Sequence, residues 1–71
     1  MLLRISDGEA IGELIAFFRS RECTVRRVAG NTIEVEAHPT LAAATARMEL
    51  DLLLRVWQEM HPRVHVREIH D

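Results

Sequence analysis

The stretch from Thr24 to Ala37 reads TVRRVAGNTIEVEA, in which two β-branched runs are separated by the dipeptide Gly30-Asn31. Glycine and asparagine tolerate the positive φ that tight two-residue hairpin turns require. The stretch therefore predicts a β-hairpin, with strands over residues 24–29 and 32–37. It is the strongest local signal in the chain, and the other elements are placed around it.

The two strands of this hairpin differ in their patterns. Apolar and polar residues alternate strictly from Thr32 to Ala37, which predicts one buried face and one charged face. In the preceding strand, Val25 and Val28 are three residues apart and break the period of two. We therefore expect a β-bulge or a frayed edge around Arg26-Arg27.

The chain before the hairpin predicts a strand and then a helix. Residues 2–5 alternate in polarity, with Leu3 and Ile5 on the apolar face. Ser6 lies three residues before Glu9, the spacing of a capping box in which each side chain caps the backbone N–H of the other residue. The helix that follows should end near Arg21-Glu22. Its apolar residues fall on one side of the helical wheel: Ala10, Ile11, Leu14, Ile15, Phe17 and Phe18.

The chain after the hairpin predicts a second, longer helix and a last strand. Proline disfavours helical geometry in the residue before it, so His38-Pro39 ends the hairpin, and Thr40 can act as the N-cap of a helix from about Leu41 to Met60. Val64 and Val66 then alternate with polar neighbours in a strand that ends near Ile69. One broad apolar arc of the helix is wide enough to cover a small sheet: Ala42, Ala43, Ala46, Leu50, Leu53, Leu54, Trp57 and Met60.

These elements follow the order strand, helix, strand, strand, helix, strand. That order predicts an α+β domain of the ferredoxin-like type, a β-α-β-β-α-β sandwich with two helices on one face of a four-stranded antiparallel sheet. A chain of 71 residues has room for one domain, so we expect residues 1–71 to form it.

The composition argues against several classes of protein. A single cysteine, Cys23, rules out an intramolecular disulfide framework, and we expect it to be a small buried residue rather than a reactive thiol. The first residues do not resemble a secretory signal, and the longest apolar run, Leu14 to Phe18, is too short to span a bilayer. We therefore expect a cytoplasmic protein that does not associate with membranes.

Nucleic acid is not an expected partner. All nine basic residues are arginine, but they are dispersed among eleven carboxylates, and the net charge is −2. Such a distribution forms no electropositive surface for a nucleic acid. The two strands expected at the centre of the sheet, residues 1–5 and 32–37, also lack the aromatic side chains on which RNA-binding versions of this fold stack bases.

The longer helix carries a second apolar stripe, opposite its broad arc, made of Leu41, Met48, Leu52 and Val56. The last three recur at steps of four and therefore form a ridge. The stripe is either a set of ordinary exposed apolar residues or a contact surface, because contiguous exposed ridges tend to mark interfaces. If it packs on its own copy, a two-fold dimer with antiparallel helices is the simplest closed solution.

The sheet face away from the helices is expected to be charged. In the usual strand order of this fold, arginines flank two glutamates on that face, so cross-strand ion pairs would neutralise it. The alternative is a site for an anion or small acid, with Arg4, Arg26 and Arg67 as the groups that hold it. The residues expected on this face are Leu2, Arg4, Arg26, Glu34, Glu36, His65 and Arg67.

No catalytic, metal or cofactor site is predicted. The candidate metal ligands His38, His61, His65 and His70 match no metal-binding spacing. Glu34 and Glu36 could act with His65 as acid and base, but no apolar pocket that would shift a pKa is evident around them. An enzyme is therefore the least supported hypothesis.

Two resemblances bear on function. Ser6-Asp7-Gly8, with Gly12 and Leu14, resembles the loop after the first strand of ACT domains, although Ala10 replaces their usual glycine. This resemblance implies a ferredoxin-like module that binds amino acids across a dimer interface. Residues 3–7, together with residues 55–57 and 61–62, are more similar to short uncharacterised bacterial proteins of ferredoxin-like type, which implies no activity.

The prediction is therefore a small, non-enzymatic binding or interaction module that acts as a homodimer or contacts another protein. The alternative is an ACT-like regulatory module that binds an amino acid or small carboxylate at a dimer interface. Thermal-shift screening against amino acids and small anions distinguishes the two, because a ligand that binds only the folded state raises its apparent stability.

Overall fold

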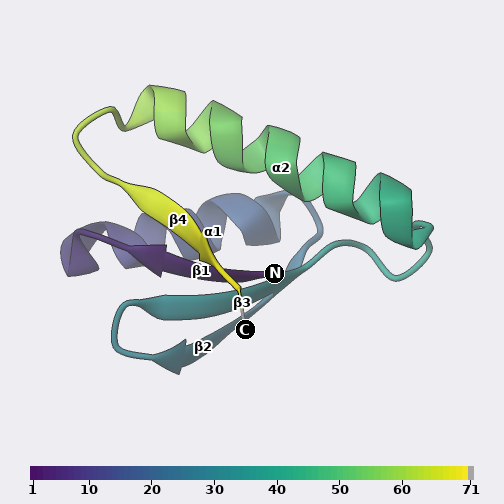
Figure 1. Ribbon diagram of the computed structural model, residues 1–71, viewed down its shortest axis with the longest axis horizontal. Coiled ribbons are helices and arrows are strands. Elements are labelled where there is room, and N and C mark those ends of the chain that lie inside the picture. Colours follow the sequence, from purple (N-terminus) through teal and green to yellow (C-terminus); the bar gives the residue numbers. More distant parts are fainter. Residues whose placement is uncertain (71) are drawn as a thin grey trace.

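The computed structural model describes residues 1–70, which form four β-strands and two α-helices (Figure 1). The strands are β1 (Leu2–Ile5), β2 (Thr24–Ala29), β3 (Thr32–Glu36) and β4 (Val66–Ile69). The helices are α1 (Ile11–Ser20) and α2 (Ala43–Met60), and a short 3-10 helix, η1 (Gly8–Ala10), precedes α1. No helix in this described part of the chain combines the length and apolarity needed to cross a membrane.

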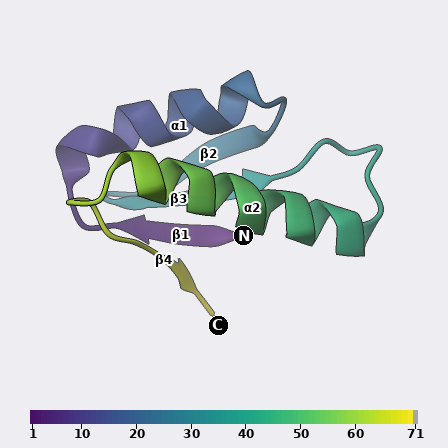
Figure 2. The ribbon, with the colours of Figure 1, turned by 90° about the horizontal axis from the view of Figure 1, so that it is seen from above.

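The strands form one sheet in the order β2-β3-β1-β4, and each neighbouring pair is antiparallel. Each helix connects two strands that are not neighbours: α1 leads from β1 to β2, and α2 leads from β3 to β4. Figure 2 shows both helices on the same face of the sheet. The predicted α+β class with a four-stranded antiparallel sheet and two helices is therefore confirmed.

The hydrophobic core lies between the sheet and the two helices. Alternate residues of the central strands point into it, among them Leu3, Ile5, Ile33 and Val35. The largest fully buried side chain is Trp57 of α2. Burial of each large apolar side chain contributes about 1.5–3 kcal/mol to folding, so the stability of this small protein depends on a few residues.

The hairpin is confirmed, with one correction. Ala29 is paired with Thr32, so Gly30-Asn31 is the loop, and the register shifts at Val28, one residue beyond the predicted bulge position. The expectation of positive φ in this turn was wrong, because neither loop residue adopts it. The bulge at Val28 increases the local right-handed twist of β2 beside the loop, the twist that a turn with positive φ would otherwise match.

The start of the first helical segment differs from the predicted capping box. Asp7, not Ser6, is the N-cap, and its Oδ1 accepts the backbone N–H of Glu9 at 3.0 Å. The Ser6 hydroxyl instead accepts the backbone N–H of His65 at 2.9 Å, which joins the end of β1 to the residue before β4. Sequence spacing alone could not reveal this competing long-range partner.

α1 ends close to the predicted position, in a C-cap that lacks glycine. Glu22 has φ 63°, the only positive φ of a non-glycine residue in the described chain. The N–H groups of Glu22 and Cys23 donate to the carbonyl oxygens of Arg19 and Phe18, each at 3.1 Å, in the pattern of a Schellman motif. Glycine usually occupies this left-handed position.

The second helix begins later than expected, and Thr40 does not cap it. Its N-cap is Ala42, without a side-chain hydrogen bond, whereas the Thr40 hydroxyl lies 2.7 Å from Nδ1 of His38. Ala42, Ala43 and Met60, assigned above to the broad buried arc, are exposed. At 1.5 Å per residue α2 is about 27 Å long, whereas strands of four to six residues span roughly 13–20 Å, and the N-terminal end of the helix extends beyond the sheet (Figure 1).

Candidate functional site

α2 carries apolar residues on two opposite faces. Leu50, Leu53 and Trp57 on one face are buried in the core. Four residues at steps of four are exposed, in a row that begins on the opposite face and drifts toward the buried side by its last member: Met48 (72%), Leu52 (57%), Val56 (39%) and Met60 (56%). We call these four residues the α2 ridge. The sequence predicted that Met48, Leu52 and Val56 are exposed. It placed Met60 on the buried arc, although Met60 continues the spacing of four residues from Val56.

The α2 ridge is uncovered in the protomer. Figure 1 shows α2 at the top of the molecule, with its outer side turned away from the sheet and from α1. The exposed fractions of the four side chains correspond to about 400 Å² of apolar surface, a size at which the largest patch on a monomer is often functional. Leu41, the fourth residue of the predicted stripe, is also exposed but precedes the helix.

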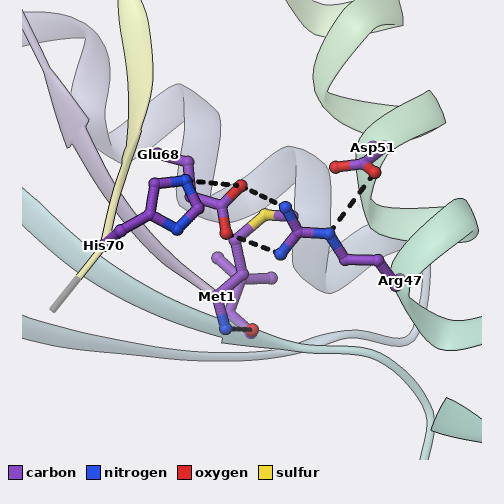
Figure 3. Close-up of polar contacts among 6 residues, drawn as sticks. Met1, Arg47, Asp51, Glu68 and His70 are labelled. Atoms are coloured by element: carbon purple, nitrogen blue, oxygen red, sulfur yellow. Dashed lines mark hydrogen bonds and ion pairs between the residues drawn. The ribbon is translucent and has the colours of Figure 1, made fainter. Parts of the chain in front are cut away.

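α2 is held to β4 by an ion-pair network (Figure 3). Two nitrogens of the Arg47 guanidinium donate to the two carboxylate oxygens of Glu68, and its Nε lies 3.4 Å from Oδ2 of Asp51. His70 Nε2 lies 3.9 Å from the Glu68 carboxylate. The hydrogen bond from Arg47 lowers the pKa of Glu68, and the same bond raises the pKa of Arg47. The sequence did not predict this network, whose principal partners are 21 residues apart.

The C-terminal end of α2 is fixed by Gln58 and His61. The Gln58 amide nitrogen donates to the carbonyl oxygens of His61 and Val64, and its Oε1 accepts the N–H of Val66 at 3.0 Å. The His61 ring stacks on Trp57 with centroids 4.0 Å apart, and its Nε2 lies 3.1 Å from the carboxylate of Glu13 on α1. The ridge therefore lies on a helix held at both its β4 and its α1 side.

The uncovered sheet face carries one of the expected cross-strand ion pairs. Arg26 donates to Glu34 at 3.1 Å, and the two residues are directly paired in the ladder. The expectation that arginines flank the glutamates on both sides was wrong. Leu2 lies opposite Glu34 on β1, and Arg4 is paired with Thr32 on one side and with Arg67 on the other. The register of the β1–β4 pair therefore places Arg4 and Arg67 directly opposite each other.

The other predicted candidates are dispersed. His65 precedes β4 and is exposed, whereas His38, His61 and His70 contact Thr40, Glu13 and Glu68, respectively. Within residues 1–70, no group of three or more histidine, cysteine, aspartate or glutamate side chains is arranged to hold a metal ion.

Cys23 is buried, as predicted, at 8% exposure. Burial raises the pKa of its thiol, and the nearby Glu49 raises it further. The thiol is thus held in its protonated, unreactive form at neutral pH. It forms part of the wall of a depression of about 370 Å³ near the start of α2, which is also bordered by Arg21, His38, Thr40, Leu41 and Glu49.

Comparisons with protein-family models, with curated proteins and with solved structures each found no match to this chain. The resemblances to ACT domains and to short bacterial proteins are therefore left untested.

Proposed function

We propose that this protein is a small, non-enzymatic interaction module that forms a homodimer through the α2 ridge. The observation that supports the proposal is the row formed by Met48, Leu52, Val56 and Met60, which extends over three turns of a well-anchored helix and is exposed throughout. A row of this kind adds nothing to the core of the protomer. Its apolar surface is buried only if another molecule covers it.

A second copy of the chain is the occupant that the geometry favours. Residues at steps of four form the ridge that packs into the matching groove of another helix in the commonest class of helix pairs, at about −50°. The α2 helix of a second copy supplies both the same ridge and the same groove. The flanks carry both signs of charge, with Glu49 on one side and Arg55 and Glu59 on the other.

The available area also suits a dimer of modest affinity. The ridge provides about 400 Å² of apolar surface per protomer, roughly half of the 800 Å² per partner in an interface of standard size. The polar flanks of α2 would supply the remainder as a rim, the usual arrangement around an apolar interface centre. A two-fold axis crossing the middle of α2 closes the assembly, so that no ridge is left over to recruit further copies.

The proposal is tested by sedimentation equilibrium of the wild type and of the double variant Leu52→Glu/Val56→Glu. The wild type should behave as a dimer and the variant as a monomer, because four glutamates would meet at the dimer centre. Both positions are exposed in the protomer, so circular dichroism should stay unchanged. The matched control is Ala16→Glu, an exposed position on α1, which should remain a dimer. A wild type that stays monomeric at high concentration, or a folded double variant that stays dimeric, would overturn the proposal.

We also propose that the fold is ferredoxin-like. The strand order β2-β3-β1-β4 supports it, as does the way each helix crosses over one intervening strand on the same face of the sheet. Cross-strand nuclear Overhauser contacts test it most simply. Contacts from Leu3 to both Ile33 and Glu68 are expected, because β1 lies between β3 and β4. Contacts between β1 and β2 instead would contradict this topology.

A further inference from the structure

Arg4 and Arg67 form a pair of like charges on the uncovered face of the sheet. They are directly opposite each other in the antiparallel ladder between β1 and β4. Arg4 lies between the buried residues Leu3 and Ile5, so its side chain points to the other face. Arg67 lies between Val66 and Glu68, and the Glu68 side chain reaches α2, so Arg67 points away from the helices as well.

Neither arginine is neutralised by the described part of the chain. The ion pairs among residues 1–70 engage Arg26 and Arg47, together with His61 and His70, and none includes Arg4 or Arg67. The nearest carboxylates in the ladder are committed elsewhere, since Glu34 accepts from Arg26 and Glu68 accepts from Arg47. Like charges directly opposite each other destabilise a strand pair, so a bound anion would relieve a cost built into this sheet.

An aliphatic pair adjoins the two arginines on the same face. Leu2 is paired with Ile69, two residues along the same ladder from the Arg4–Arg67 pair, and both side chains are half-buried. Two residues of extended strand correspond to about 7 Å, the length of a short alkyl chain. The face therefore offers two guanidinium groups next to a small aliphatic surface.

We propose that Leu2, Arg4, Arg67 and Ile69 form a binding site for a small aliphatic carboxylate. The two guanidinium groups hold the carboxylate by charge-assisted hydrogen bonds, for which their planar donor pairs are suited. The alkyl chain lies along Leu2 and Ile69. Arg26, a candidate for this role in the sequence, is left out because Glu34 already occupies its guanidinium group. The site is on the opposite side of the protomer from the α2 ridge, so it goes beyond the proposed dimer and does not depend on it.

The test is a titration of the isotopically labelled protein with 4-methylpentanoate in low-chloride buffer, followed by amide chemical shifts. Saturable shifts should be confined to β1, β4 and the adjoining part of β3. Arg4→Gln and Arg67→Gln should each weaken binding roughly tenfold, the effect of one hydrogen bond to a charged group. Arg63→Gln is the control, because Arg63 is an exposed arginine outside the site without an ion pair in the described chain, and this variant should bind like the wild type. The uncharged amide 4-methylpentanamide should not bind.

Four results would overturn the assignment. One is the absence of saturable shifts, and another is equal binding of 4-methylpentanamide. The third is an equal loss of affinity in Arg63→Gln, which would indicate a general effect of charge. The fourth is acetate that binds as tightly as 4-methylpentanoate, because acetate has the same carboxylate without the longer alkyl chain and equal binding would contradict a role for Leu2 and Ile69. Folding is checked without ligand, where Arg67→Gln should melt no lower than the wild type because the like-charge pair is removed.

Discussion

The two apolar faces of α2 are similar in composition but differ in what lies opposite them. Leu53 and Trp57 face the sheet and are almost completely buried, whereas Leu52 and Val56, their sequence neighbours, face away from it. Hydrophobicity alone does not distinguish them. The side of the helix that carries Leu53 and Trp57 therefore forms part of the core of the protomer, whereas the side that carries Leu52 and Val56 does not. The proposed dimer gives the outer side a role.

The largest expected effect is on stability, and it should separate the two faces. Trp57→Ala should cost about 3–5 kcal/mol of unfolding free energy, because it opens a cavity in the core. Leu52→Ala should change the stability of the protomer by no more than about 0.5 kcal/mol. Urea denaturation at low protein concentration, where the dimer is dissociated, measures both. A comparable cost at Leu52 would contradict the account by indicating that the ridge is covered within the protomer.

The next effect concerns the extent of the ridge. If Met60 belongs to it, Met60→Ala should weaken dimerisation about fivefold, as expected for loss of roughly 1 kcal/mol at an interface. Met48→Ala should act similarly, since these two residues lie at opposite ends of the ridge. Analytical ultracentrifugation at several concentrations gives the dissociation constants. An unchanged constant for Met60→Ala would shorten the ridge to three residues.

The smallest effect concerns the ion pair that fastens the inner side of α2 to β4. The pKa of Glu68 is lowered from its ordinary value of 4.5 by the hydrogen bond from Arg47. Its contribution to stability is therefore present above that value and is lost as the pH falls through the lowered pKa. Glu68→Gln should melt below the wild type at neutral pH, and the two curves should converge in acid.

Glu36→Gln is the control for this pH dependence, because Glu36 is an exposed carboxylate at the end of β3, away from α2, without an ion pair in the described chain. Its melting temperature should follow that of the wild type across the same pH range. A difference between wild type and Glu68→Gln that persists unchanged into strong acid would indicate that Glu68 acts by packing and not by its charge.

Local patterns predicted the elements of this fold well. Alternation located the strands, and the break between Val25 and Val28 correctly indicated a bulge. Features that depend on partners far along the chain could not be predicted in the same way. The Ser6 hydroxyl binds near β4 instead of capping a helix, and the Arg47–Glu68 pair joins residues on different elements.

The candidate sites show the same limit. The ridge was visible because its residues share one helix, and only Met60 was misplaced, since the helical wheel places it beside Leu53 and cannot show that no other element covers the last turn of α2. The sheet face was predicted as a set of charges, but their pairing requires the register. A shift of one strand relative to another decides whether Arg4 meets a glutamate or Arg67, and in this ladder it meets Arg67.

The central claim, that the outer face of α2 holds two copies together, is tested most directly by thermal unfolding at increasing protein concentration. Association stabilises the folded state by mass action, so the melting temperature of a dimer rises with concentration. The wild type should show this rise, and Leu52→Glu/Val56→Glu should melt at a constant temperature over the same range. A wild-type melting temperature that does not change with concentration would contradict the claim.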